Sequence, residues 1–164
     1  MHEYIKANVS DWESEDELSE YLRKILKKEA GDGSGLIYGM GHAVYTLSDP
    51  RAVILKEYAG KMAEGTEFEK EYHLLEAIER LTPLIFEEVK HSGKVMCANI
   101  DMYSGFVYRM LGIPEELFTP LFAVSRMAGW CAHRFEEINS GKRIIRPAYK
   151  SVSHEKKYID IKDR

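Results

Sequence analysis

The sequence predicts an all-α protein. Start signals for helices recur along the chain: the capping boxes Ser14–Glu17 and Thr66–Glu69 and the pair Asp49–Pro50 each precede a helix-forming segment. Apolar side chains then repeat every three or four residues, as they do on one face of a helix. The chain contains no internal repeat and no low-complexity segment, so one helical fold accounts for the whole pattern.

Each predicted helix has its own boundaries. The first helix follows Ser14 and ends before Gly31, and the second runs from Pro50 to about Glu64. The third follows Thr66 and continues toward Gly93. The last two span Met102–Leu111 and Phe122–Ile138. Leu36–Ser48 is expected to be a loop, and Pro83 is expected to break or kink the third helix, because proline removes a helical hydrogen bond. The polar tail after Gly141 contains two short strand-like pieces, Arg143–Arg146 and Tyr158–Ile161.

The composition limits the class of protein. With 164 residues, 45% hydrophobic and 30% charged, the chain is long enough for one compact domain or a domain with an arm. A net charge of -4 gives no reason to expect nucleic-acid binding, and no apolar run reaches the ~20 residues of a membrane span. The N-terminus is not a signal peptide. Cys97 and Cys131 form no paired motif, so a reducing, cytoplasmic location is the simplest expectation.

Three polar residues are candidates for a site, although each also has an ordinary structural explanation. His42 follows a glycine pair and could be a plain loop histidine. Asp101 precedes a helical segment and could simply cap it. Arg126 lies within an otherwise apolar stretch, and a buried arginine requires an anionic partner.

Four runs of residues, in a fixed order, resemble the citrate synthase family. They cover Leu36 to Lys150, about two-thirds of the chain. The runs are Gly39–Tyr45 followed by Asp49–Arg51, Asn99–Asp101 followed by Tyr103–Gly105, Phe122–Gly129, and Arg146–Pro147.

The resemblance implies a domain organisation. The family is a homodimer of largely helical subunits, each with a large and a small domain. Residues 1–118 would correspond to the small domain, and residues 119–164 to the C-terminal helix and tail of the large domain. The family also carries a histidine in an Asn-His-Glu-like run and another histidine earlier still, and neither run occurs in these 164 residues.

The resemblance also implies roles in condensing acetyl-CoA with oxaloacetate. Asp101 would be the base that removes a proton from the thioester methyl group, and His42 would polarise and protonate the oxaloacetate carbonyl. The donor that steadies the enolate oxygen is the histidine missing here. Arg51, Arg126 and Arg146 would bind the oxaloacetate carboxylates, because arginine forks suit carboxylates. The last of these reaches the neighbouring subunit's site in the family.

Acetyl-CoA would be a co-substrate, and the resemblance implies neither a metal nor a further cofactor. The family has a basic residue shortly after the loop histidine, where this chain has Thr46–Ser48. Either the CoA phosphate is bound more weakly here, or Lys94 takes the place of that contact. The candidate CoA-binding residues are Leu36, Ile37, Tyr38, Gly39, Met40, Gly41, Lys94 and Asn99.

The expected function is therefore that of the C-terminal part of a citrate synthase, inactive on its own. Two alternatives stay open. One is a 2-methylcitrate synthase that uses propionyl-CoA, and the other is a non-catalytic module that binds CoA or a protein partner.

Overall fold

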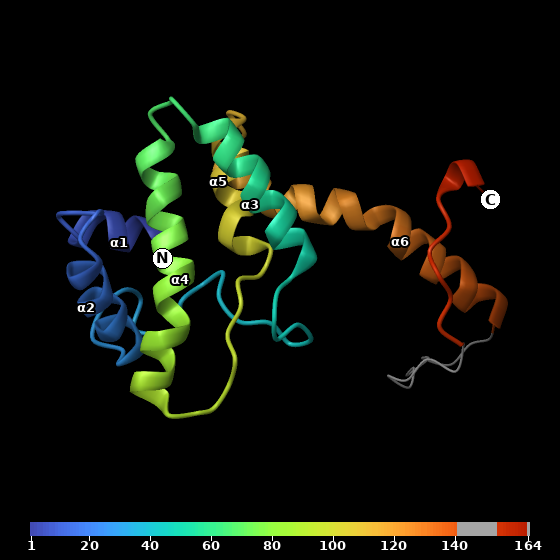
Figure 1. Cartoon of the computed structure of the whole chain (residues 1–164). Helices are drawn as coiled ribbons and strands as arrows, with labels where there is room; N and C mark the ends of the chain where they lie inside the picture. The colour runs from blue at the N-terminus through green and yellow to red at the C-terminus, as the bar shows by residue number, and fades with distance from the viewer. Residues whose placement is uncertain (141–153, 164) are drawn as a thin grey trace. The chain divides into compact units, whose positions relative to one another are not determined.

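The computed structural model describes residues 1–140 and 154–163, and its regular structure in those ranges is helical (Figure 1). The expectation of an all-α protein is confirmed. The helices are α1 (His2–Asn8), α2 (Glu15–Leu26), α3 (Pro50–Ala63), α4 (Glu69–Lys90), α5 (Asp101–Met110), η1 (Glu115–Leu117), α6 (Phe118–Ser140) and η2 (Ile161–Asp163).

The chain forms two compact units, Met1–Pro120 and the part from Leu121 onward. In the first unit, α2 packs against α4 and α3 packs against α5. Their facing side chains form one continuous core of mostly aliphatic residues, with a fully buried tyrosine among them: Leu18, Leu22, Leu74, Leu75, Ile78, Met102 and Tyr103. Burial of this kind is the main favourable term in folding.

The predicted start of α2 is confirmed. Ser14 Oγ accepts a hydrogen bond from the Glu17 N–H at 3.4 Å. The Glu17 carboxylate does not complete the reciprocal half of a capping box. It accepts instead from the N–H groups of Ser10 and Asp11, at 2.7 and 3.1 Å, so it ties the preceding loop to the helix.

The predicted start of α3 is also confirmed. Asp49 Oδ1 accepts a hydrogen bond from the Arg51 N–H at 3.0 Å, and Pro50 occupies the first turn. The helix ends at Ala63, and Gly65 follows with a φ of 68°. This left-handed conformation favours glycine and ends the helix where the sequence places its stop.

Two expectations about α4 are corrected. The helix starts at Glu69, and Thr66 is not its N-cap. The Thr66 hydroxyl instead donates to the Ala63 carbonyl and accepts from the Phe68 N–H, which forms a turn before the helix. Pro83 does not break the helix, which continues to Lys90. The ~3 kcal/mol cost of an internal proline is offset by core packing on both sides of it, at Ile78, Leu81, Thr82 and Ile85.

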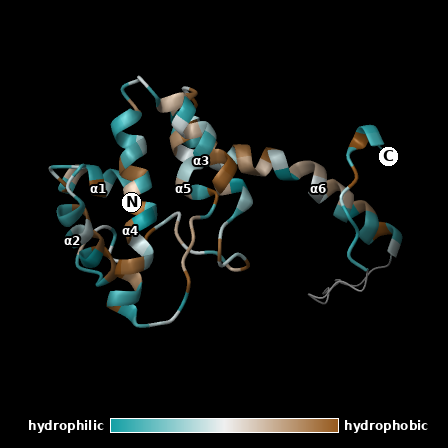
Figure 2. Ribbon diagram, viewed as in Figure 1, coloured by the Kyte–Doolittle hydropathy of each residue, from teal (hydrophilic) through white to brown (hydrophobic). Residues whose placement is uncertain are grey.

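The last two predicted helices are confirmed, and two other segments differ from expectation. The second unit contains α6 after its first turn, and no residue of this helix is buried, although hydrophobic residues recur along it (Figure 2). The strand expected at Tyr158–Ile161 is wrong, since this stretch has no strand and leads into η2. The strand expected at Arg143–Arg146 lies outside the described residues. Helix α1 was not expected.

Candidate active site

Two segments that are far apart in the sequence meet beside the start of α5. The Gly41 N–H donates to the Cys97 carbonyl at 2.7 Å, and the Asn99 N–H donates to the Gly39 carbonyl at 2.9 Å. Met40 and Ala98 form an isolated antiparallel bridge between these bonds. The loop that contains Gly39 and Gly41, called the glycine loop below, is therefore joined to the segment that leads into α5.

The glycines of this loop are required by its own packing. Gly39 and Gly41 both have a φ of 90°, a backbone conformation that residues other than glycine rarely adopt. A Cβ atom at Gly39 would lie 2.8 Å from the Met102 Cα, closer than real contacts allow. The loop thus lies against the first turn of α5, and no larger residue fits at position 39.

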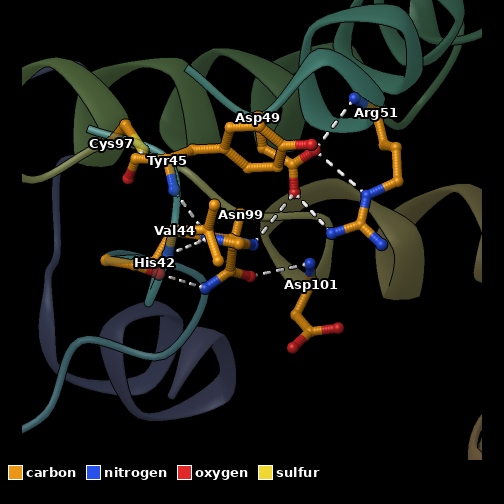
Figure 3. A network of polar contacts seen from close by, with 9 residues as sticks. His42, Val44, Tyr45, Asp49, Arg51, Cys97, Asn99 and Asp101 are labelled. Atoms are coloured by element: carbon orange, nitrogen blue, oxygen red, sulfur yellow. Dashed lines mark hydrogen bonds and ion pairs between the residues drawn. The ribbon is translucent and has the colours of Figure 1, made fainter. Parts of the chain in front are cut away.

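The His42 ring is oriented by the backbone that follows it. Its Nδ1 atom accepts hydrogen bonds from the N–H groups of Val44 and Tyr45, at 2.9 and 3.0 Å (Figure 3). Because Nδ1 accepts both bonds, the ring proton lies on Nε2. Nε2 lies 3.8 Å from Oδ2 of the buried Asp49, and the His42 side chain is 18% exposed.

Asp49 and Arg51 form a paired charge next to His42. The Asp49 side chain is fully buried, and Arg51 donates to both of its oxygens, from Nε at 3.0 Å and from NH2 at 2.8 Å. The Arg51 guanidinium lowers the pKa of Asp49 from its ordinary value. The Arg51 side chain is itself 58% exposed, which leaves N–H donors for an anionic ligand.

Asp101 is the first residue of α5, and its carboxylate is exposed. Its backbone N–H donates to Asn99 Oδ1 at 2.9 Å. The carboxylate points away from the surrounding network in Figure 3. An accessible carboxylate is a suitable proton acceptor for a ligand. Asp101 and Gly39 also line a cavity of about 290 Å³, together with Tyr38, Phe106 and Arg109.

The segment 36–41 exposes only part of itself. The side chains of Ile37 and Met40 belong to the core, whereas Leu36 and Tyr38 are about half exposed. The Tyr38 hydroxyl donates to Asp32 Oδ2 at 2.8 Å. A ligand on this segment would therefore meet Leu36, Tyr38 and the backbone of the glycines.

The remaining candidates are Lys94, Arg126 and Arg146. Lys94 is exposed and lines a different, open cavity with Glu87 and His91. Arg126 lies on α6 and is exposed, so the burial expected from its apolar surroundings is wrong; its guanidinium lies 5.3 Å from the centre of the Phe122 ring. Arg146 lies outside the described residues. The structure thus brings together His42, Arg51, Asn99 and Asp101.

One polar cluster behind the site was not anticipated from the sequence. Tyr103, two residues after Asp101, is fully buried and donates to Glu79 Oε2 at 2.5 Å. Lys56 Nζ lies 2.8 Å from the same oxygen. Burial, reinforced by the bond to Glu79, raises the pKa of Tyr103, so the phenol stays protonated as a donor. The apolar spacing of α4 gave no sign that Glu79 faces inward.

The described ranges lack two kinds of feature. Residues 1–140 and 154–163 contain no group of three or more His, Cys, Asp or Glu side chains placed to hold a metal ion. Within the same ranges, no helix has both the length and the hydropathy that crossing a bilayer requires.

Comparison with known proteins identifies close relatives. Residues 2–148 match the family model described as citrate synthase, C-terminal domain. The chain is 40% identical over 134 residues to a citrate synthase of Deinococcus radiodurans, an alignment that covers 81% of this chain and 34% of the relative. It is 41% identical over 130 residues to a 2-methylcitrate synthase of Shewanella oneidensis, covering 78% and 32%.

A solved structure gives the same picture. The chain is similar to a citrate synthase from the thermophilic archaeon Thermoplasma acidophilum, in a ternary complex with carboxymethyl coenzyme A and oxaloacetate. The TM-score is 0.66 and the identity 30%, covering 99% of this chain and 41% of the other. The chain spans about a third of the length of the two curated relatives.

Proposed function

The chain belongs to the citrate synthase family, and from that premise we propose that it is the C-terminal part of a citrate synthase, which converts acetyl-CoA and oxaloacetate to citrate and CoA. One observation carries the proposal. A histidine with its proton on Nε2 and an exposed aspartate come from two segments that are hydrogen-bonded to each other, at the positions matching the family's motifs. His42 and Asp101 together supply the acid and the base that the formation of a carbon–carbon bond between the two substrates requires.

In the first step, the Asp101 carboxylate removes a proton from the acetyl methyl group. The methyl carbon is a very weak acid, so the negative charge that develops on the thioester oxygen requires a hydrogen-bond donor. In the family that donor is a histidine with no counterpart in these 164 residues. The base and the enolate donor therefore come from different parts of the full-length protein.

In the second step, the enolate carbon attacks the carbonyl carbon of oxaloacetate and forms the new bond. The carbonyl oxygen takes the proton from His42 Nε2. The two backbone N–H groups on Nδ1 support this direction of transfer, because they orient Nε2–H as the donor. Water then hydrolyses the citryl thioester, which releases citrate and the CoA thiol.

The substrates are held by charge and by the loop. Arg51, Arg126 and Arg146 bind the two carboxylates of oxaloacetate, and the paired Asp49 keeps the Arg51 fork oriented while other N–H groups remain free for the ligand. The CoA moiety lies along residues 36–41, with Lys94 near its phosphates.

The assembly is also part of the proposal. We assign residues 1–118 to the small domain and residues 119–164 to the large domain, and we propose a homodimer in which Arg146 reaches the partner's site. The exposed thiol of Cys131 and the buried thiol of Cys97 are both free, which is in keeping with a cytoplasmic location.

The test is an assay of the full-length protein. Release of the CoA thiol is followed with oxaloacetate and acetyl-CoA, for the wild type and for His42→Ala. We expect turnover by the wild type and a loss of about 100-fold or more in kcat for the variant, since a positioned acid contributes that much. A wild-type protein that binds CoA without turnover would instead be a non-catalytic module.

The same assay decides the acyl group. The identities to a citrate synthase and to a 2-methylcitrate synthase are nearly equal, at 40% and 41%, so identity does not favour either substrate. Replacing acetyl-CoA by propionyl-CoA compares kcat/KM for the two. A higher value for propionyl-CoA would make 2-methylcitrate the product.

A further inference from the structure

The Asn99 side chain contacts both segments of the candidate site. Its Nδ2 donates to the Gly41 carbonyl at 2.8 Å, next to His42, and its Oδ1 accepts from the Asp101 N–H at 2.9 Å (Figure 3). The two bonds use both heteroatoms of the amide. The side chain therefore connects the residue before the proposed acid with the proposed base itself.

The backbone of the same residue adds to this connection. The Asn99 N–H donates to the Gly39 carbonyl, and its carbonyl accepts from the Met102 N–H at 3.1 Å. Asn99 thus makes four hydrogen bonds, two to the glycine loop and two to the first turn of α5. Gly39 and Gly41 have no side chains that could pack against α5, and their φ of 90° disfavours any larger residue. The hydrogen bonds of Asn99 therefore help to hold the loop in place.

We propose that Asn99 is a positioning residue that sets the distance and angle between His42 and Asp101. This inference rests on the proposed function. Asparagine has the form that this role requires, because its short side chain presents an acceptor for the start of a helix and a donor for a carbonyl on two separate atoms. Aspartate would keep the acceptor but would oppose the Gly41 carbonyl with a second oxygen.

The proposed role has a specific kinetic signature. A group that positions the acid and the base acts in the transition state, so its loss lowers kcat and leaves substrate affinity nearly unchanged. A CoA contact would instead raise KM for acetyl-CoA. Misplacing reacting groups by about 1 Å costs on the order of 100-fold in rate.

The experiment compares full-length wild type, Asn99→Ala and Asn99→Asp. We expect kcat to fall about 100-fold in Asn99→Ala, with KM for acetyl-CoA changed by less than about threefold. With methyl-deuterated acetyl-CoA, the isotope effect on kcat should increase, because proton removal by a misplaced Asp101 becomes slower than the other steps. A loss of folded protein alone would not change that isotope effect.

The second variant protects the test against a folding failure. Asn99→Asp retains the acceptor for the Asp101 N–H and so retains the start of α5, yet it loses the donor to Gly41. We expect a similar fall in kcat. A matched control is Asn8→Ala, since the Asn8 amide also donates to a backbone carbonyl, that of Tyr4 at 2.8 Å, in the exposed α1. It should leave kcat and KM unchanged.

Two results overturn the inference. An increase in KM for acetyl-CoA at unchanged kcat in either Asn99 variant would make this residue a CoA contact. Wild-type kinetics in Asn99→Asp would mean that the bond to Gly41 positions nothing. An inactive wild type is a different outcome, because it refutes the proposed function and the inference falls with it.

Discussion

The unit Met1–Pro120 and the helix α6 use their apolar residues in opposite ways. The first buries its aliphatic side chains in one cluster, in which Leu22 and Leu75 are fully inaccessible. Helix α6 buries none of its residues, and Val124, Phe135 and Ile138 are each at least 65% exposed. Soluble monomers rarely expose an apolar stripe of this length. The first unit thus contains its own core, whereas α6 requires a partner surface.

The proposed site is divided in the same way. The unit Met1–Pro120 contains four of the candidate residues, His42, Arg51, Asn99 and Asp101. Arg126 lies on α6, which has no buried residues. The comparison therefore predicts that the first unit fixes the geometry of the acid and the base, and that the second supplies substrate binding only when its apolar face is covered. The four predictions below test this division.

The largest expected effect is on activity. The 164-residue chain, assayed by itself for thiol release from acetyl-CoA and oxaloacetate, should be at least ~1,000-fold less active than the full-length enzyme, since the enolate donor alone contributes ~100- to 1,000-fold. The control is the full-length enzyme at equal active-site concentration. Comparable turnover would mean that the site is complete in this chain.

The next effect separates the two regions within the full-length enzyme. Asp101→Asn should lower kcat by roughly 100- to 1,000-fold while oxaloacetate binding is retained, because the amide keeps the shape but not the base. Arg126→Ala should weaken oxaloacetate binding by roughly 10- to 100-fold, the value of a charged hydrogen bond. Calorimetric titration with oxaloacetate distinguishes them. Loss of the same step in both variants contradicts the assigned roles.

Stability should differ between the regions too. Leu75→Ala should lower the free energy of unfolding of this chain by about 2–5 kcal/mol, since it leaves a cavity in the core. Phe135→Ala should change it by less than about 0.5 kcal/mol at dilutions where the chain is monomeric, because the ring is 70% exposed in a single chain. Urea denaturation at such dilutions, followed by circular dichroism, measures both. Equal losses would show that α6 packs within a single chain.

The weakest expected effect is the self-association of the isolated chain, which is measured as a change in mass. We expect the isolated chain to self-associate through the apolar residues of Phe122–Ile138, because burying a few hundred Å² at ~25 cal/mol per Å² favours pairing. Exchange of the helix and tail between two chains would be the simplest symmetric arrangement. Light scattering over a tenfold dilution measures the mass. A constant 18.9 kDa at every concentration would exclude this pairing.

Local signals in the sequence predicted most of the helices. The Ser14 and Asp49 caps were read correctly, because each cap is a contact within three residues. Helix α1 could not be predicted, since its first turn has no side-chain cap and Ile5 is its single buried residue. The break expected at Pro83 is wrong, because buried residues of α4 on both sides of the proline pack in the core.

The site was only partly predictable. The motif resemblance selected His42, Arg51, Asn99 and Asp101, which the fold does bring together. No local pattern indicated that Asn99 contacts Gly41, or that Tyr103 donates to Glu79, because these partners are 58 and 24 positions apart. Contacts over such separations depend on how helices pack, and a single sequence does not encode that packing as a spacing.

The bond from Asn99 to Gly41 has a consequence for the order of folding. The hydrogen bonds of a helix join residues four positions apart and form in about a microsecond, whereas joining positions 58 apart costs the closure entropy of a long loop. The intervening chain contains α3 and α4, and the docking of these helices offsets that cost, so we expect the loop to meet the start of α5 after they have docked. The acid and the base are therefore expected to find each other late, and mutations that weaken their link should speed unfolding more than they slow folding.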